Sequence, residues 1–277
     1  MSEINNGKLK TNSMSNSRPL YIIGAGGFGR EVAWLVERIN ADAVKKGLEA
    51  PWRIEGFIDN DESIFGTELD GYKIQGGHDV IENYGTDVWC VVAVGGAKGR
   101  RKGVSRLEPF SHIHFATLID PSAIIGRTCT VGEGCMICAG NIITTDVKIG
   151  NHVIVNLDCT IGHDANISSY VTLYPSVNVS GNVNVGECTE IGTGSAIIQG
   201  IEIGSGTIIG ANSTVIRNIE DNVTAVGSPA MVVKRHEMDI SYKKSGGVQR
   251  KLHSTKQARY KIIISPSTAC RQRRRVA

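Results

Sequence analysis

A run of aliphatic residues spaced six apart is the feature of this sequence that most limits its fold. Sixteen consecutive positions with this spacing, from Ile125 to Val215, hold Ile, Val or Leu without a gap. These three residue types make up roughly a quarter of an ordinary chain, so chance would produce such a run about once in billions. An α-helix repeats about every 3.6 residues and a half-buried strand about every 2, so strict sixes suit neither alone. Short strands stacked as the coils of a β-solenoid do fit, because each hexad supplies one face and one inward side chain.

Glycine follows the aliphatic residue in half of the hexads, at positions 126, 132, 150, 162, 186, 192, 204 and 210. There the chain must turn a corner that a Cβ atom would obstruct. At three hexads per coil, the run makes about five coils. The register fails at Asp221, and residues 226–230 read as an exit turn. The pattern therefore predicts a parallel β-solenoid over residues 119–234.

A glycine-rich turn stands near the start of the chain. A short apolar segment, 20–23, runs into residues 24–29, which read GAGGFG, and an amphipathic helix is expected from there. Further strands are expected at 54–58, before Asp59, and at 88–94, before Gly95. Strands that alternate with helices and end in Gly or Asp predict a small parallel sheet over residues 19–118, with ligand contacts at its carboxyl edge.

The GxGxxG motif leaves its ligand open. Asp59 comes about thirty residues after Gly29, whereas the acid of a dinucleotide site follows after about twenty. The segment is also short for a full dinucleotide domain. If a ligand binds, a mononucleotide or a nucleotide-sugar fits this size better than NAD. The alternative is a glycine turn that packs helix against sheet and binds nothing.

The two ends of the chain differ from the middle. Residues 1–18 are polar, and from Lys234 onward the chain has 13 of its 30 Lys and Arg but only two acids. We expect both 1–18 and 235–277 to be disordered. The basic tail could bind nucleic acid, but it has little aromatic interleaving, so we do not expect that partner. No apolar stretch approaches 18 residues and no signal core is present, which predicts a cytoplasmic protein without a membrane span.

His163 and Asp164 carry the most suggestive chemistry in the repeat. A neutral histidine is a practical general base, and a neighbouring carboxylate could fix its tautomer. The alternative is a solvated pair on a coil corner. His152, which has no acid beside it, is interpreted as a surface residue. Cys135 and Cys138 form a CxxC without a second Cys or His pair, so no metal site is expected.

Together the hexads, the GAGGFG turn, the GFIDND strand end at 56–61 and the GSPA at 227–230 resemble a known family. They are similar to the sugar acetyltransferases related to the sialic acid O-acetyltransferase and the bacillosamine-pathway N-acetyltransferase, over about residues 19–234. This resemblance implies a Rossmann-like α/β domain followed by an all-β left-handed parallel β-helix. It also implies a homotrimer that binds acetyl-CoA between adjacent solenoids.

The resemblance places the family's functional residues on this chain. It implies that His163 is the general base and that Asp164 is the acid beside it. The implied nucleotide-sugar contacts are Gly26, Gly27, Phe28, Asp59, Asn60 and Gly95. The implied acetyl-CoA contacts are Thr172, Gly181, Thr193 and Ala211. Two positions depart from the family: Thr172 stands where some relatives have a second histidine, and Asn60 stands where an acid is frequent.

The expected function is transfer of an acetyl group from acetyl-CoA to a hydroxyl or amine of a sugar or nucleotide-sugar, in surface polysaccharide or glycan biosynthesis. One general base serves either acceptor, so the residues do not decide between O- and N-acetylation. Two alternatives stay open at this point. The solenoid could be a non-catalytic assembly platform with a nucleotide-sensing domain, or the tail could make the protein a nucleic-acid binder.

Overall fold

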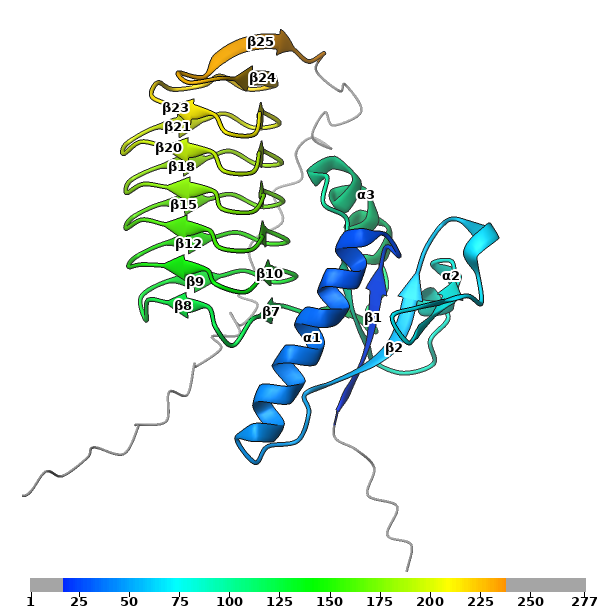
Figure 1. Ribbon diagram of the computed structural model, residues 1–277. Helices are drawn as coiled ribbons and strands as arrows, with labels where there is room; N and C mark the ends of the chain where they lie inside the picture. The colour runs from blue at the N-terminus through cyan, green and yellow to red at the C-terminus, as the bar shows by residue number, and fades with distance from the viewer. Residues whose placement is uncertain (1–16, 238–277) are drawn as a thin grey trace, which may run out of the picture. The chain divides into compact units, whose positions relative to one another are not determined.

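The computed structural model describes residues 17–237 of the chain. They belong to one compact unit, in which an α/β part precedes a stack of very short strands (Figure 1). Of the two segments expected to be disordered, the structure describes only residues 17–18 and 235–237. The rest of 1–18 and of 235–277 lies outside the described residues. No helix within 17–237 is long and apolar enough to cross a membrane.

A six-stranded sheet forms the N-terminal part. All of its neighbouring strands are parallel except the pair β3 and β4 at one edge. The strands expected at 20–23, 54–58 and 88–94 correspond to β1, β2 and β5, whereas β3 and β4 carry no long apolar run and were not expected. In sheet order the strands are β3 (Glu68–Leu69), β4 (Tyr72–Gly76), β2 (Trp52–Ile58), β1 (Arg18–Ile23), β5 (Val88–Val92) and β6 (Ile113–Phe115).

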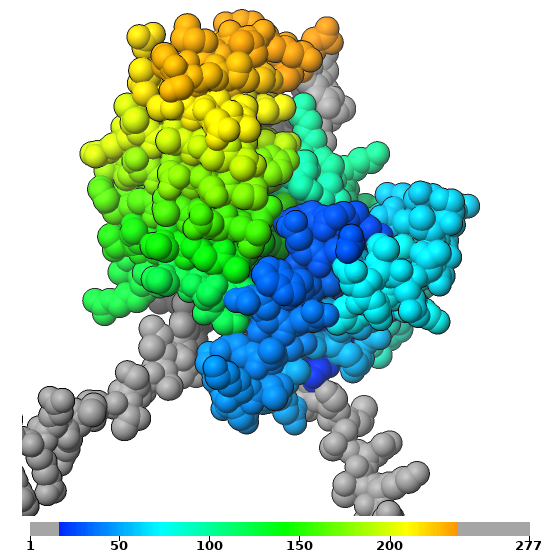
Figure 2. Space-filling model, in the orientation of Figure 1, coloured from blue at the N-terminus to red at the C-terminus, as the bar shows by residue number. Residues whose placement is uncertain are grey.

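Helices cover both faces of this sheet because β1 is apolar on both sides. The helix expected after the glycine turn is α1 (Gly27–Lys45), and it buries Leu35 with Ile22 of β1 and Met136 of the solenoid in one core. Accordingly, α1 lies between the sheet and the coils, and Figure 2 shows it (blue) against the lower coils (green). On the opposite face, α3 (Ala97–Leu107) packs in a second core. The short elements are η1 (Glu62–Ile64) and α2 (Asp79–Glu82).

The solenoid has three faces, each a parallel sheet of stacked strands. Face 1 consists of β7 (Leu118–Ile119), β10 (Met136–Ile137), β13 (Ile154–Val155), β16 (Thr172–Leu173), β19 (Glu190–Ile191), β22 (Ile208–Ile209) and β24 (Val223–Val226), with β25 (Met231–Arg235) added antiparallel. Face 2 consists of β8 (Ile124–Ile125), β11 (Ile142–Ile143), β14 (Thr160–Ile161), β17 (Asn178–Val179), β20 (Ala196–Ile197) and β23 (Thr214–Val215). Face 3 consists of β9 (Thr130–Val131), β12 (Lys148–Ile149), β15 (Asn166–Ile167), β18 (Asn184–Val185) and β21 (Glu202–Ile203).

The hexad aliphatics form the inner core, as predicted. Each coil has 18 residues, since Met136 pairs with Ile154 and Ile154 pairs with Thr172. From Ile137 to Val215 every hexad aliphatic is at most 4% exposed. At 25 cal/mol per Å² of buried apolar surface, a fully buried Ile or Val contributes roughly 1.5–3 kcal/mol, so this column is the main source of the solenoid's stability.

The corners of the coils have a repeating backbone conformation. In most hexads the third residue after the aliphatic has a left-handed φ near +55° to +60°, for example 55° at His152 and 59° at Asp164. Non-glycine residues adopt this conformation only at some cost, and Asn and Asp tolerate it best. We name the corners by the faces they join: corner 1–2 contains Thr193, corner 2–3 contains His163, and corner 3–1 contains His152.

Candidate active site

The carboxyl edge of the N-terminal sheet carries the glycine turn. Gly24 has φ +107°, and a Cβ atom on Gly29 would overlap the Gly24 carbonyl oxygen, so these two glycines build the turn itself. Gly26 and Gly27 have a different role. Both are exposed, and a Cβ on either would meet nothing within 4 Å. The turn therefore leaves open space in front of the N-terminus of α1, where unpaired backbone N–H groups are suited to bind an anionic ligand.

Asp59 completes this turn from the end of β2. Its Oδ2 accepts the Ala25 N–H at 2.8 Å, and its Oδ1 accepts the N–H groups of Asn60 and Asp61 at 2.7 and 3.1 Å. Both carboxylate oxygens are thus engaged by backbone of the same chain. This arrangement joins the ends of β1 and β2. It gives Asp59 a structural role beside the ligand contact predicted for it, and leaves the exposed Asn60 side chain facing outward.

The loop after β5 lies next to the same edge. A Cβ on Gly24 would be 3.1 Å from the carbonyl oxygen of Ala93, which places the two turns in contact. Gly95 is fastened to face 1 of the solenoid, because the Thr172 hydroxyl donates to its carbonyl oxygen at 2.7 Å. Strands β2, β1 and β5 are neighbours. The structure therefore brings the six predicted nucleotide-sugar residues to one edge: Gly26, Gly27, Phe28, Asp59, Asn60 and Gly95.

His163 and Asp164 lie on corner 2–3, directly after β14. The His163 Nδ1 is 2.8 Å from the Asp164 Oδ2, and both side chains are about half exposed, at 52% and 54%. A carboxylate at Nδ1 selects the tautomer in which Nδ1 carries the proton and the Nε2 lone pair is free. The ring lies over Gly181 of the next coil, where a Cβ would be 2.5 Å from Nε2. The pair has the chemistry of a general base with its orienting acid.

The predicted acetyl-CoA residues do not all lie near this pair. Thr193 and Ala211 are exposed on corner 1–2, on successive coils, whereas Gly181 lies beneath His163 on corner 2–3. Thr172 is only 1% exposed, and its hydroxyl is engaged with Gly95 and Arg100. That burial does not support a direct contact between Thr172 and acetyl-CoA.

Comparisons with known proteins bear on this geometry. The family model described as the PglD N-terminal domain matches residues 19–107. A histidine-to-asparagine variant of perosamine N-acetyltransferase from Caulobacter crescentus, solved with CoA and GDP-perosamine, is 27% identical with a TM-score of 0.68 and covers 78% of this chain and 96% of its own. WeeI from Acinetobacter baumannii has the same identity, TM-score and coverage of this chain, and the match covers 100% of the WeeI chain. The acetyltransferase domain of PglB from Neisseria gonorrhoeae, solved with acetyl coenzyme A, is 26% identical with a TM-score of 0.66, covering 78% and 100%. No curated protein matches the chain.

The chain is a sugar acetyltransferase, and it resembles the hexapeptide-repeat superfamily. The predicted fold class, a Rossmann-like domain followed by a left-handed parallel β-helix, is confirmed. The prediction of an enzyme is confirmed as well, which removes the alternative of a non-catalytic platform. Within residues 17–237, no group of three or more His, Cys, Asp or Glu side chains could hold a metal ion. The basic tail, on which a nucleic-acid role depended, lies outside the described residues.

The interpretation of His152 as a surface residue of this acetyltransferase is wrong. His152 is 5% exposed on corner 3–1, where its ring stacks on Tyr170 with centroids 5.1 Å apart and meets the edge of Phe115 at 4.9 Å. Phe115 comes from the N-terminal domain, so periodicity within the solenoid could not reveal this contact. Burial, and then the charge of Arg100, lower the pKa of His152 to about 4. His152 is a neutral packing residue between the two domains.

We expect His152 to make the fold sensitive to acid. Its pKa is about 4 when folded and about 6.5 when unfolded, so the unfolded chain binds the extra proton. Stability is therefore complete above pH 6.5 and falls as the pH drops toward 4, by about 1–2 kcal/mol at pH 5. Urea unfolding at pH 7.5 and pH 5 should show a smaller loss in His152→Phe than in the wild type. Equal losses would refute this assignment.

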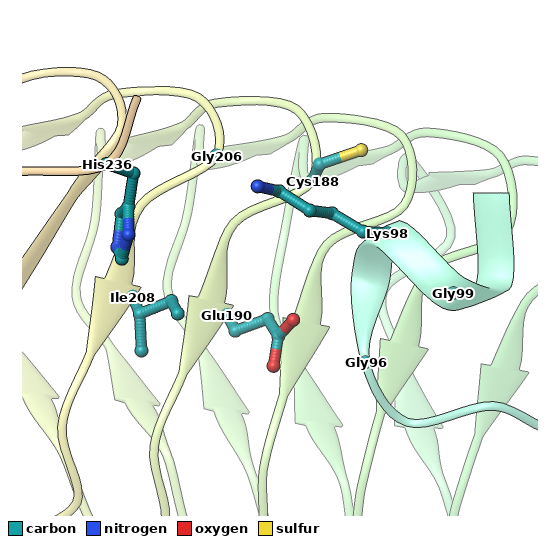
Figure 3. Close-up of a pocket in the computed structure, with 8 residues that line it drawn as sticks. All are labelled: Gly96, Lys98, Gly99, Cys188, Glu190, Gly206, Ile208 and His236. Atoms are coloured by element: carbon teal, nitrogen blue, oxygen red, sulfur yellow. The ribbon is translucent and has the colours of Figure 1, made fainter. Parts of the chain in front are cut away.

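Three contacts of the acetyltransferase escaped the sequence analysis. The first is that of Arg100, which is fully buried between the domains. The other two are made by Glu190 of face 1, which accepts hydrogen bonds from the Ala97 N–H at the start of α3 and from the Tyr174 hydroxyl. A cavity of about 250 Å³ lies beside Glu190. Figure 3 shows it between the start of α3 and the coils, with Lys98 and His236 at its rim. These residues are far apart in sequence and share no motif, so no pattern within the sequence could predict that they meet.

Proposed function

We propose that this enzyme transfers the acetyl group of acetyl-CoA to the amino group of a nucleotide-linked sugar. The observation that carries the proposal is the meeting of the six nucleotide-sugar residues on one sheet edge, with their Gly95 loop fastened to the solenoid. An amine acceptor is favoured over a hydroxyl because one similar structure is named a perosamine N-acetyltransferase and contains CoA and GDP-perosamine.

In this proposal the sheet edge holds the nucleotide. The exposed N–H groups around Gly26 and Gly27, at the positive end of the α1 dipole, bind the diphosphate. The half-buried Phe28 packs beside them, and the side chain of Asn60 contacts the nucleoside. Asp59 keeps the turn in shape through its three backbone bonds. Gly95 then lies on the path from the diphosphate to the solenoid.

The proposed reaction is direct transfer in a ternary complex. The sugar nitrogen attacks the thioester carbonyl carbon, a C–N bond forms, and the C–S bond breaks to release CoA. Nε2 of His163 accepts the proton that the nitrogen loses and returns it to the leaving thiolate, while Asp164 holds Nδ1–H and stabilises the imidazolium. No covalent enzyme intermediate is needed.

The exposed surface of the coils supports a homotrimer as part of the proposal. Face 3 has charged outward residues at Lys148 and Glu202, and face 1 is largely covered by the chain's own N-terminal domain. Face 2 has no outward charge, and Ile124 and Ile142 on it are 64% and 42% exposed. Exposed apolar surface of this kind marks an interface. The outward residues of face 2 are Ile124, Ile142, Thr160, Asn178, Ala196 and Thr214.

A trimer that packs through face 2 also completes the active site. Face 2 is bounded by corner 1–2 and corner 2–3, so neighbouring chains would bring unlike corners together in a cyclic arrangement. Acetyl-CoA would then lie in the groove between them, against Thr193 and Ala211 of one chain and beside Gly181 and His163 of the next. Acetyl-CoA and nucleotide-sugars are cytoplasmic metabolites, so the proposal includes a cytoplasmic location.

A substrate panel tests this function directly. The enzyme would be incubated with acetyl-CoA and amino-sugars linked to UDP, GDP, dTDP or CMP, with the matching hydroxyl sugars as controls, and CoA release would be followed. We expect turnover with at least one nucleotide-linked amino-sugar and a product carrying an amide, identified by mass spectrometry. Turnover confined to hydroxyl sugars would replace the amine by an alcohol acceptor, and no turnover on any of them would contradict the proposal.

A further inference from the structure

Arg100 is the largest fully buried side chain among the described residues. Its guanidinium donates to two carbonyl oxygens of the loop before α3, those of Val94 and Gly95, at 2.8 and 2.9 Å. On the solenoid it reaches two successive coils. Its acceptors there are the carbonyl oxygens of His152 (2.8 Å), Tyr170 (2.7 Å) and Val171 (3.1 Å) and the hydroxyl of Thr172 (2.9 Å).

A buried guanidinium in this position needs a reason. Among residues 17–237 no carboxylate is hydrogen-bonded to Arg100, and its partners are neutral oxygens. Burial lowers its pKa to about 10, which still leaves it charged at neutral pH. Removing such a charge from water is costly, and an apolar side chain would fill the same space without that cost. What only the planar fork supplies is a set of simultaneous bonds to backbone oxygens of both domains.

Those bonds determine which way the loop's peptide groups point. The carbonyl groups of Val94 and Gly95 are turned toward Arg100, and Thr172 donates to the second of them. In a trans peptide the N–H points opposite to the C=O, so the N–H groups of Gly95 and Gly96 face away from the guanidinium. Neither N–H has a hydrogen-bond acceptor within residues 17–237. Two successive outward N–H groups form a small anion-binding surface.

The next residue is anchored too. The Ala97 N–H donates to Glu190 Oε1 at 2.9 Å, and Figure 3 shows that carboxylate directed toward the start of α3. Glu190 is held by the Tyr174 hydroxyl at 3.0 Å. Residues 94–97 are therefore fixed on the solenoid side at three places. The two free N–H groups lie between these anchors, directly after Ala93 and Val94, which lie close to Gly24 of the glycine turn.

We propose that Arg100 is a positioning residue for the nucleotide-sugar. It holds the Val94 and Gly95 carbonyl groups against the solenoid, so that the N–H groups of Gly95 and Gly96 are presented to the diphosphate or the sugar attached to it. Through these bonds the sheet edge that binds the nucleotide and the solenoid that carries out the transfer keep a constant relation. This inference rests on the proposed function and assigns to Arg100 a role in acceptor binding.

Steady-state kinetics of Arg100→Met test it. Methionine fills most of the space but donates no hydrogen bond, so the Val94 carbonyl loses its donor and the Gly95 carbonyl keeps only the Thr172 hydroxyl. We expect the KM for the nucleotide-sugar to rise at least about tenfold, while the KM for acetyl-CoA stays within about twofold of the wild type. Arg100→Lys, which keeps the charge without the planar fork, should give an intermediate rise of about threefold. Lys102→Met, the same change on the exposed side of α3, is the matched control and should change neither KM.

A nucleotide-sugar KM within twofold of the wild type in Arg100→Met would overturn the inference, and so would an equal rise of both KM values. If that variant does not fold, Thr172→Val decides, because it removes one donor from the Gly95 carbonyl and only one of the six acceptors of Arg100. It should raise the nucleotide-sugar KM about threefold. An unchanged value, or a rise confined to acetyl-CoA, would overturn the inference.

Failure of the proposed function would look different. The wild-type enzyme could fail to acetylate every nucleotide-sugar of the panel and also fail to bind UDP, GDP, dTDP and CMP in calorimetry. That result would refute both the proposed function and the role of Arg100. If the wild-type enzyme is active on a nucleotide-sugar and Arg100→Met leaves its KM unchanged, only the positioning role of Arg100 is refuted.

Discussion

Replacing His163 by Gln should lower kcat at least about 1000-fold with little change in the KM of either substrate. Glutamine has a similar length and can hydrogen-bond Asp164, but it cannot accept the proton that the attacking amine must lose. General-base catalysis contributes about 10²–10⁴-fold, so the loss corresponds to roughly 4 kcal/mol of transition-state stabilisation. CoA release at saturating acetyl-CoA and nucleotide-sugar measures it. Because His163 is half exposed, the substitution should leave the melting temperature nearly unchanged.

Two controls make this result specific. Sedimentation equilibrium should give the mass of three chains for both the variant and the wild type, and calorimetry should give equal affinities for CoA. Asp164→Asn should lose less, about 10- to 100-fold, since it disturbs the tautomer but retains the base. A kcat near the wild-type value in His163→Gln would remove His163 from the mechanism. A wild-type mass of one chain would remove the trimer and the shared groove.

Much of the solenoid follows from local physics. A face of a coil can be only a few residues long, so each must contribute an inward aliphatic, and the register of sixes made the inward column of Ile137 to Val215 predictable residue by residue. The glycine turn was predictable for a similar reason, because Gly29 packs against the carbonyl of Gly24, five residues earlier in the sequence. Both features depend on neighbours along the chain or at a constant period.

The junction between the domains depends on residues that are neither neighbours along the chain nor spaced at a constant period. Arg100 stands in the basic stretch 98–102, yet among the described residues it is the largest side chain that is fully buried. Four of its six hydrogen-bond acceptors belong to coils 52 to 72 residues later. His152 was misjudged for the same reason, and the burial of Thr172 could not be predicted either. Their partners, Phe115 and Gly95, belong to the other domain and follow no period.

The active site was predictable only in parts. Composition and motif drew attention to the His163–Asp164 pair, and the structure places these two side chains in contact at 2.8 Å. The predicted acetyl-CoA residues Thr193 and Ala211 lie on another corner of the same chain. No pattern within one sequence states which corners of neighbouring chains would meet in the proposed trimer, since that depends on how exposed surfaces pack.

Gly181→Ala should lower kcat about 100-fold while leaving the fold intact. The His163 ring lies over Gly181, and an added Cβ would be 2.5 Å from Nε2, so the ring must move aside. Because the ring is the end of a flexible side chain exposed to solvent, this movement costs little stability, about 1 kcal/mol or less. A displacement of about 1 Å in a catalytic group can cost 10²-fold in rate. Stopped-flow or steady-state measurement of CoA release gives the change in kcat, and a thermal melt gives the change in stability.

The repeat itself supplies the control for this substitution. Ala139 and Ala211 occupy the same place in their hexads as Gly181, so the corner backbone accepts a Cβ and the effect must come from the ring above it. In a His163→Gln background, Gly181→Ala should therefore add almost nothing to the loss in kcat. A full additional loss there, or a rise in the KM for acetyl-CoA with kcat unchanged, would show that Gly181 serves acetyl-CoA directly instead of seating the base.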